Sequence, residues 1–239
     1  MTLIEQSPIN DMLTRGETLG GQVYRWLANA ITAGSYSPKE RINIRRLADE
    51  LRSSVTPVRE AVLRLVAEGV LETTDTGAII VPERTQGEIQ EIFEVRSALE
   101  GEMALAAAPN ITDEDVKNLG SIQSSFLDAL DQSDYREVLK LNAIFHFSIY
   151  KRANLPLRLK IVETLWLRIG PTLRYMYPIL HKGRSDHRRH ENIIEAAASR
   201  DPNALRSAIL LDLASSQAAL HQYLQDHSVL PRRRSRRNG

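Results

Sequence analysis

Apolar residues recur every three or four positions along most of the chain, which is the spacing of an amphipathic helix. In the N-terminal third this pattern predicts three helices, over 18–34, 44–52 and 55–68. Ser54 stands at a favourable N-cap position for the third helix, and Gly69 follows its end. Two short apolar runs, 70–74 and 78–81, then flank a turn that contains Gly77, and they predict a β-hairpin.

From residue 86 onward the spacing is helical to near the end of the chain, with prolines between the segments. The pattern predicts further helices over 86–108, 113–131, 134–152, 156–180, 186–199 and 202–226. Three helices followed by a two-stranded wing is the order of a winged helix-turn-helix. The predicted fold is therefore mainly α, with an N-terminal winged helix-turn-helix and a C-terminal all-α helical bundle.

The same pattern divides the chain into segments. We predict a DNA-binding unit over 18–82, a linker over 83–88 and a helical domain over 89–226. Residues 1–17 show no period and are predicted to be a mobile arm. Residues 227–239 contain five arginines and a proline, and we predict a disordered basic tail there.

Composition and charge narrow the possible functions. The chain has no cysteine, which excludes a disulfide framework, a cysteine-bound metal and thiol catalysis. No apolar run reaches the roughly 18 residues of a membrane span, and no secretory signal is visible, so we expect a cytoplasmic protein that does not enter a membrane. Without the five tail arginines the net charge is −4, yet residues 39–64 carry +3. A local patch, rather than the whole surface, is therefore the predicted contact with nucleic acid.

The predicted reading surface lies at the start of the third helix. The helix that enters a major groove must present polar and cationic residues at its N-terminal end. Ser54, Thr56 and Arg59 occupy that end, and Arg45 and Arg46 begin the preceding helix. A solvated pair of charged helices would give a similar pattern, but the hairpin at the correct distance favours DNA binding.

A second group of polar residues falls on apolar helix faces. Asn142 and His146 are four residues apart on the face that carries Phe145, while His190 and Asp212 each share an apolar stripe. An unsatisfied buried polar group costs about 1–3 kcal/mol, so these residues require partners. A metal ion would satisfy all four. A hydrogen-bonded cluster that pairs His190 with Asp212 and Asn142 with His146 would do so too, and periodicity alone favours it.

Several stretches resemble known families. The segments IRRLADEL, TPVREAVLRLVAEGVLE and TGAIIV resemble the GntR family of bacterial transcription factors, and EIFEVRSALEGEMALAAA is similar to the start of the FCD effector domain of its FadR-type branch. The resemblance covers about residues 19–225 and implies that Arg45, Thr56 and Arg59 contact the operator and that Gly77 enters the minor groove. Val55 replaces the family's usual arginine, so we expect a direct guanine contact to be missing.

The resemblance also implies a divalent metal held by an Asp-(x)3-His pair and two later histidines. Asn142, His146, His190 and Asp212 fall at these positions. Asn142 replaces an aspartate and Asp212 a histidine, so a bound dication would still leave a net charge of +1, which argues for a retained ion such as zinc, nickel or manganese. Arg96 matches an arginine of the family's ligand cavity and is expected to bind a carboxylate effector. An ion pair with Glu100 is its alternative role.

Together these observations predict a DNA-binding transcriptional regulator, a repressor controlled by a small organic acid, and not an enzyme. Since one recognition helix offers too little specific contact, we expect a homodimer that reads a pseudo-palindromic double-stranded operator. The alternative is a metal-dependent hydrolase that uses His146, His190 and Asp212. It would need a general base beside an open metal position, and the sequence has no His-Glu-(x)2-His motif, nucleophile elbow or glycine-rich phosphate loop.

Overall fold

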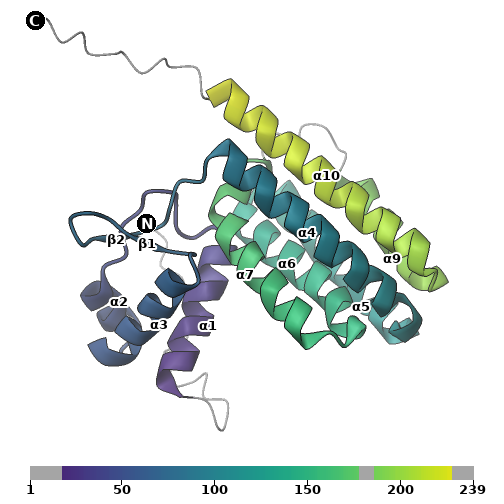
Figure 1. Ribbon diagram of the computed structural model, residues 1–239. Coiled ribbons are helices and arrows are strands. Elements are labelled where there is room, and N and C mark those ends of the chain that lie inside the picture. Colours follow the sequence, from purple (N-terminus) through teal and green to yellow (C-terminus); the bar gives the residue numbers. More distant parts are fainter. Residues whose placement is uncertain (1–17, 178–185, 228–239) are drawn as a thin grey trace, which may run out of the picture.

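The computed structural model describes residues 18–177 and 186–227, which form a small N-terminal unit and a larger helical unit (Figure 1). The predicted arm over 1–17 and the tail beyond residue 227 lie outside the described residues. Within the described chain, no helix combines the length and the apolar character needed to cross a bilayer.

The N-terminal unit contains three helices and a hairpin: α1 (Leu19–Thr32), α2 (Ile44–Glu50), α3 (Val55–Ala67), β1 (Glu72–Thr73) and β2 (Ile79–Ile80). The strands are antiparallel, with Glu72 opposite Ile80. An isolated bridge also joins Arg41 to Ile80, so the segment before α2 lies against the wing. The apolar stripes of the three helices meet in one core, to which Val23, Leu27, Leu47, Val58, Val62 and Leu65 contribute. This is the winged helix-turn-helix order that the sequence predicts.

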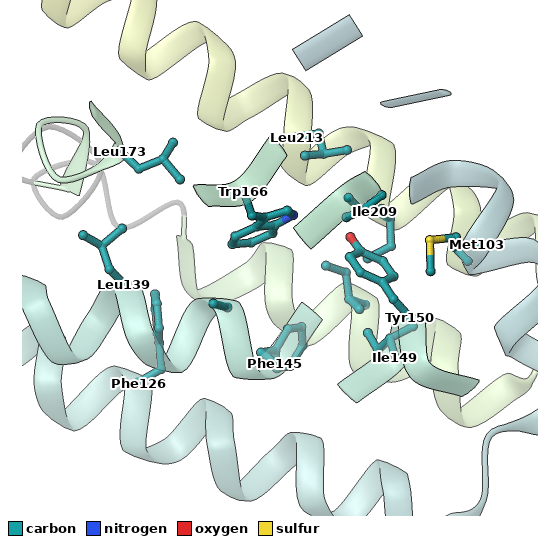
Figure 2. Packing of buried hydrophobic residues seen from close by; sticks show 14 of the residues in the cluster. Met103, Phe126, Leu139, Phe145, Ile149, Tyr150, Trp166, Leu173, Ile209 and Leu213 are labelled. Carbon is teal, nitrogen blue, oxygen red and sulfur yellow. The ribbon is translucent and has the colours of Figure 1, made fainter. Parts of the chain in front are cut away.

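The larger unit is a bundle of α4 (Gln86–Ala107), η2 (Ala108–Asn110), α5 (Asp113–Asp131), α6 (Tyr135–Tyr150), η3 (Lys151–Ala153), α7 (Pro156–Leu173), α9 (Asp186–Ser199) and α10 (Pro202–His227). Helices α4 and α10 lie side by side, and α5 packs on α6 (Figure 1). Capping boxes at Thr85/Glu88 and Thr112/Asp115 satisfy the first amides of α4 and α5. Figure 2 shows Phe145, Tyr150 and Trp166 among the buried side chains of this bundle.

The helix over 156–180 and the two strands were predicted to be longer than they are. The helix predicted over 156–180 ends at Leu173, and residues 174–176 form turns, because Pro171 cannot donate a backbone hydrogen bond and weakens the last turn. The strands are shorter than 70–74 and 78–81, since the amides of Val70 and Leu71 donate to the Leu65 carbonyl of α3 and not to the other strand. Helix α4 begins at Gln86, as does the predicted helix over 86–108, so its first residues overlap the predicted linker over 83–88.

Helix α7 joins the two units. Leu167 is buried in the core of the N-terminal unit, although it belongs to the bundle. Arg168 donates from Nε to the Glu68 carbonyl at the end of α3, at 2.9 Å. Arg174 donates to the Gly34 carbonyl beyond α1, at 3.3 Å. Since the carbonyl end of a helix is partly negative, both guanidinium groups hold the N-terminal unit against the bundle.

Candidate functional site

The first candidate site is a hollow of about 500 Å³ bounded by the wing, the start of α2 and α3. Arg45, Arg59 and Gly77, three of the predicted DNA contacts, all line it. Arg41 lines it as well, because the bridge to Ile80 holds residue 41 against the wing. The sequence predicted no DNA contact for Arg41, although that residue contributes to the positive charge of the segment. The structure therefore gathers three arginines around one concave surface.

Gly77 forms the tip of the wing. Its φ is +78°, a conformation that a residue with a Cβ adopts only under strain. A Cβ at this position would meet nothing within 4 Å, so the glycine is needed for its backbone shape and not for packing. The amide of Gly77 donates to the Thr74 carbonyl at 2.8 Å and closes the turn. An open, narrow tip of this kind suits the minor-groove contact that the family resemblance implies.

The remaining predicted DNA contacts lie at the N-terminal ends of α2 and α3. Ser54 is the N-cap of α3, as predicted, but its side chain makes no capping hydrogen bond, so the exposed hydroxyl is available to a phosphate. Thr56 is exposed in the first turn, and Val55 beside it is 37% exposed. Arg46 does not line the hollow and pairs through Nε with Glu50 at 2.8 Å. Its predicted DNA contact has the least support from the geometry.

The second candidate site is buried in the bundle, where α6, α9 and α10 meet. Asn142 and His146 come from α6, His190 from α9 and Asp212 from α10, and all four are buried. One ligand atom each of His146, His190 and Asp212 lies within 4.8 Å of the others. His190 Nε2 is 3.1 Å from Asn142 Oδ1, and His146 Nε2 is 3.3 Å from Asp212 Oδ2. The hydrogen-bonded alternative paired His190 with Asp212 and Asn142 with His146, so the partners are exchanged in the structure.

His190 is held by a residue that the sequence did not single out. Its Nδ1 lies 2.6 Å from Oε1 of Gln123, on α5. Burial lowers the pKa of His190 to about 3, although Asp212 opposes the shift, so the ring is neutral and has one N–H. If that proton is on Nδ1 and is donated to Gln123, then Nε2 presents a lone pair toward the cluster. This is the usual arrangement of a metal-binding histidine and its outer partner.

His146 and Asp212 complete the donor set. His146 Nε2 is buried and makes no hydrogen bond within the described structure, despite its distance of 3.3 Å from Asp212. Burial alone would raise the pKa of Asp212, but contact with His146 and the charges of His146, His190 and Arg189 outweigh it and lower that pKa. Two imidazole nitrogens, a carboxylate and an amide oxygen therefore converge with few protons among them, which suits a divalent cation.

Arg96 and Glu100 form a buried ion pair next to this cluster. Arg96 Nε donates to Glu100 Oε1 at 2.6 Å, so the ion pair considered from the sequence is formed. Trp166 Nε1 and the Tyr150 hydroxyl donate to the same carboxylate, at 3.0 and 2.5 Å. The Tyr150 hydroxyl also lies 3.3 Å from His146 Nδ1. Tyr150 thus connects the Arg96–Glu100 pair to the cluster.

Sequence reasoning missed three of these residues: Gln123, Tyr150 and Trp166. Gln123 lies on the inward stripe of α5 between Leu119 and Phe126, so its position alone indicated a buried polar group. Tyr150 is four residues after His146 and shares its helix face. Burial, and then Glu100, raise the pKa of Tyr150, which keeps its hydroxyl a donor. The local sequence pattern does not indicate which helix packs against these side chains.

Both units match known domains. Residues 19–81 match the model of the bacterial regulatory proteins of the gntR family, and residues 91–215 match the FCD domain. These ranges coincide with the winged unit and with most of the bundle.

Full-length relatives agree with this assignment. The transcriptional regulator McbR of Escherichia coli K12 is 30% identical over 84% of this chain and 92% of its own length. The Nta operon transcriptional regulator of Aminobacter aminovorans is 30% identical over 73% of this chain and 81% of its own. The solved structure of E. coli McbR/YncC superposes with a TM-score of 0.81 at 29% identity, over 86% of this chain and 98% of its own.

A solved structure of a GntR regulator from Rhodococcus sp. RHA1 has a TM-score of 0.70 at 18% identity, over 85% of this chain and 97% of its own, and shares the fold. The matched relatives are transcriptional regulators, and none of these comparisons points to an enzyme. The chain therefore belongs to the GntR family of bacterial transcriptional regulators, with an FCD domain after its DNA-binding domain.

Proposed function

We propose that this regulator is a repressor whose affinity for its operator is controlled by a small carboxylate bound at a divalent metal in the FCD domain. The observation that carries the proposal is the convergence of buried donor atoms: one atom each of His146, His190 and Asp212 lies within 4.8 Å of the others, and His146 Nε2 makes no hydrogen bond there. The contact of His146 Nε2 with Asp212 Oδ2 at 3.3 Å does not meet hydrogen-bond geometry, and a cation between the two groups would use both the imidazole lone pair and the carboxylate charge.

Asn142, His146, His190 and Asp212 would hold the ion. Two imidazoles and two oxygen donors accept zinc, nickel or manganese, and a site with few imidazoles favours the later transition metals less strongly. The ion would supply an electrophilic centre to which a carboxylate oxygen could bind. Gln123 fixes the ring of His190, and Tyr150 contacts the ring of His146, so the chain's own residues orient both imidazoles.

Arg96 is the proposed second contact of the effector. Its guanidinium has five N–H donors, and the pair with Glu100 engages Nε and Nη2. The guanidinium carbon lies 4.3 Å from the centre of the Trp166 ring, so the group is held in place by stacking as well as by charge. A fixed arginine beside the cluster suits a small organic acid, because it can pair with a second carboxylate oxygen.

DNA binding is assigned to the surface around the hollow. Arg41, Arg45 and Arg59 provide cations for phosphates or base edges, and Gly77 provides the wing tip. A homodimer would place two such surfaces on one pseudo-palindromic operator. Val95 on α4 and Leu211 on α10 are large apolar side chains left exposed on adjacent helices, which supports a dimer contact there. The E. coli relatives GlaR and RspR are described as transcriptional repressors, which supports repression.

The cluster does not favour the hydrolase alternative. A hydrolytic metal needs a carboxylate or histidine base poised near its open position. Glu100 is engaged by Arg96, Trp166 and Tyr150, and Asp212 is engaged by Arg189 and His146. Glu100 is thus occupied by its three donors, and Asp212 would be a ligand of the ion, so neither carboxylate is left to act as a general base.

The first experiment tests the metal. Elemental analysis of the purified protein should find one zinc, nickel or manganese ion per chain, and His190→Ala should lose it. His221→Ala is the matched control, because His221 lies on α10 of the bundle and does not belong to the cluster. Equal metal content in both variants would contradict the assignment.

The second experiment tests control of DNA binding. Operator affinity is measured by fluorescence anisotropy with and without citrate, before and after treatment with a chelator. The operator affinity of such a regulator should fall as the salt concentration rises. A plot of log affinity against log salt concentration should have a slope of about −0.9 per phosphate contact. Coupling of about 1–3 kcal/mol, a change of about 5–150-fold, is expected only in the metal-loaded protein. If a panel of mono-, di- and tricarboxylates leaves operator affinity unchanged in the loaded protein, the effector proposal fails.

A further inference from the structure

A groove of about 570 Å³ lies between the N-terminal unit and the bundle. Helix α1 and Arg64 of α3 line one side, and α6 and α7 line the other. Figure 1 shows α1 approaching the bundle beside α7. The volume falls within the roughly 300–1,000 Å³ of small-molecule sites. The groove is distinct from the metal cluster, with which it shares one neighbour: Trp166 lines the groove and also lies 5.4 Å, ring to ring, from His146.

The charged side chains that line the groove are mainly cationic. Arg25, Arg64, Lys151 and Lys160 line it, against the single carboxylate of Glu163. Glu163 accepts from Lys160 at 3.4 Å, and Glu68, outside the lining, accepts from Arg64 at 3.1 Å. Two of these cations also approach the ring of Tyr24, Arg64 at 3.8 Å and Lys160 at 5.8 Å. Even after both acids are counted, positive charge remains in a body whose overall charge without the tail is negative.

The lining also includes neutral polar residues, such as Asn29 and Ser148, and an apolar part. Ala28 of α1, Ala143 and Phe147 of α6, and Leu167 of α7 all contribute. Ile144 lines the same groove and is 42% exposed, so its side chain is accessible to an occupant. The groove therefore presents cationic side chains and a partly exposed apolar wall to one occupant.

We propose that this groove binds an amphipathic organic anion, with its charged head at the lysines and arginines and its alkyl or aromatic body against Ile144 and Phe147. This ligand is separate from the carboxylate effector, and its binding does not depend on the metal. Since the groove is lined by both units, an occupant contacts the DNA-binding unit and the bundle together. It therefore stabilises the docked arrangement of the two units.

The test uses octanoate as the probe, with binding to the full-length protein measured by isothermal titration calorimetry. Ile144→Glu places a carboxylate on the apolar wall and should weaken octanoate binding by about tenfold or more. Leu157→Glu is the matched control, because Leu157 is 75% exposed on α7 and does not line the groove. Circular dichroism confirms that both variants are folded. Equal binding by the two variants would overturn the proposal.

Two further arms separate charge from apolar contact and this groove from the metal cluster. Lys160→Gln should weaken octanoate binding several-fold, whereas Arg158→Gln, an exposed change two residues earlier on α7, should not. Octan-1-ol, which has the same chain without the charge, should bind much more weakly than octanoate. If octan-1-ol binds as well as octanoate, or if His146→Ala abolishes binding while Ile144→Glu does not, the groove is not an anion site.

Discussion

Arg59 combines the properties that a DNA-reading side chain needs. It is exposed on the first turns of α3 and lines the hollow together with Arg45 and Gly77. We expect Arg59→Ala to weaken operator binding by about 1–3 kcal/mol, or about 5–150-fold, because a cationic contact to a base or phosphate is lost. Fluorescence anisotropy with a promoter fragment measures this change. Lys117→Ala, an exposed change on α5 far along the chain, should leave affinity unchanged, and an equal loss in both variants would contradict the assignment.

Glu100 is fully buried and accepts hydrogen bonds from Arg96, Trp166 and Tyr150. Glu100→Gln would keep the shape of the side chain but leave the charge of Arg96 uncompensated. Removing one partner of a buried ion pair costs about 3–5 kcal/mol, so urea unfolding should show a loss of this size.

The matched control for Glu100 is on the same helix. Glu102 is exposed, and its carboxylate is 3.9 Å from Arg206. Because exposed pairs contribute about 0–1 kcal/mol, Glu102→Gln should change the unfolding free energy by less than about 1 kcal/mol. Similar losses in the two variants would mean that the Glu100 network contributes little to stability.

At the scale of helices and strands, local patterns predicted the elements well and their partners poorly. The helices of the bundle were found because their stripes and caps are local, as with Thr112 and Asp115 at the start of α5. The predicted strands were too long. Val70 and Leu71 have side chains typical of strands, but both residues lie in the core before β1 begins. The bridge from Arg41 to Ile80 joins segments far apart in the sequence, so no local pattern could reveal it.

Close contact between α1 and α7 depends on Gly170. A Cβ at this position would lie 3.0 Å from Thr32 Cα and 3.2 Å from the Ile31 carbonyl oxygen, both backbone atoms that cannot easily yield. Gly170→Ala should therefore destabilise the protein by about 1–3 kcal/mol in urea unfolding. Gly120→Ala on α5 is the control: a Cβ there meets nothing within 4 Å, so helix propensity should make it neutral or stabilising by up to about 1 kcal/mol. Equal effects would argue against close packing of α7 on α1.

At the scale of the whole molecule, one guanidinium group on α7 and one just after it attach the DNA-binding unit to the bundle. Arg168 donates to the Glu68 carbonyl, and Arg174 donates to the Gly34 carbonyl and to Ser37 Oγ, at 2.9 Å. Hydrogen bonds from charged groups contribute about 1.5–3 kcal/mol each. We expect the double variant Arg168→Ala/Arg174→Ala to unfold in two steps in calorimetry, with the N-terminal unit melting first.

Arg158→Ala on the same helix, which contacts neither carbonyl, provides the comparison and should unfold like the unchanged protein. One unaltered transition in the double variant would show that apolar contacts such as Leu167 hold the units together without the arginines.

The buried site shows the same division between local and long-range information. The spacing of Asn142 and His146 placed both on one inward face, as found, because it depends on a single helix. The hydrogen-bonded alternative gave them the wrong partners. His190 and Asp212 lie on other helices, and the packing of the whole bundle sets the rotation of those helices. Gln123, on a fourth helix, was missed for the same reason.

Three consecutive residues of α7 belong to three different environments. Trp166 hydrogen-bonds to Glu100 beside the buried cluster, Leu167 fills the core of the DNA-binding unit, and Arg168 holds the end of the recognition helix. Successive side chains on a helix point about 100° apart and turn as one rigid body. A small rotation of α7 that moves Trp166 would therefore also move Arg168 and the end of α3 that Arg168 holds.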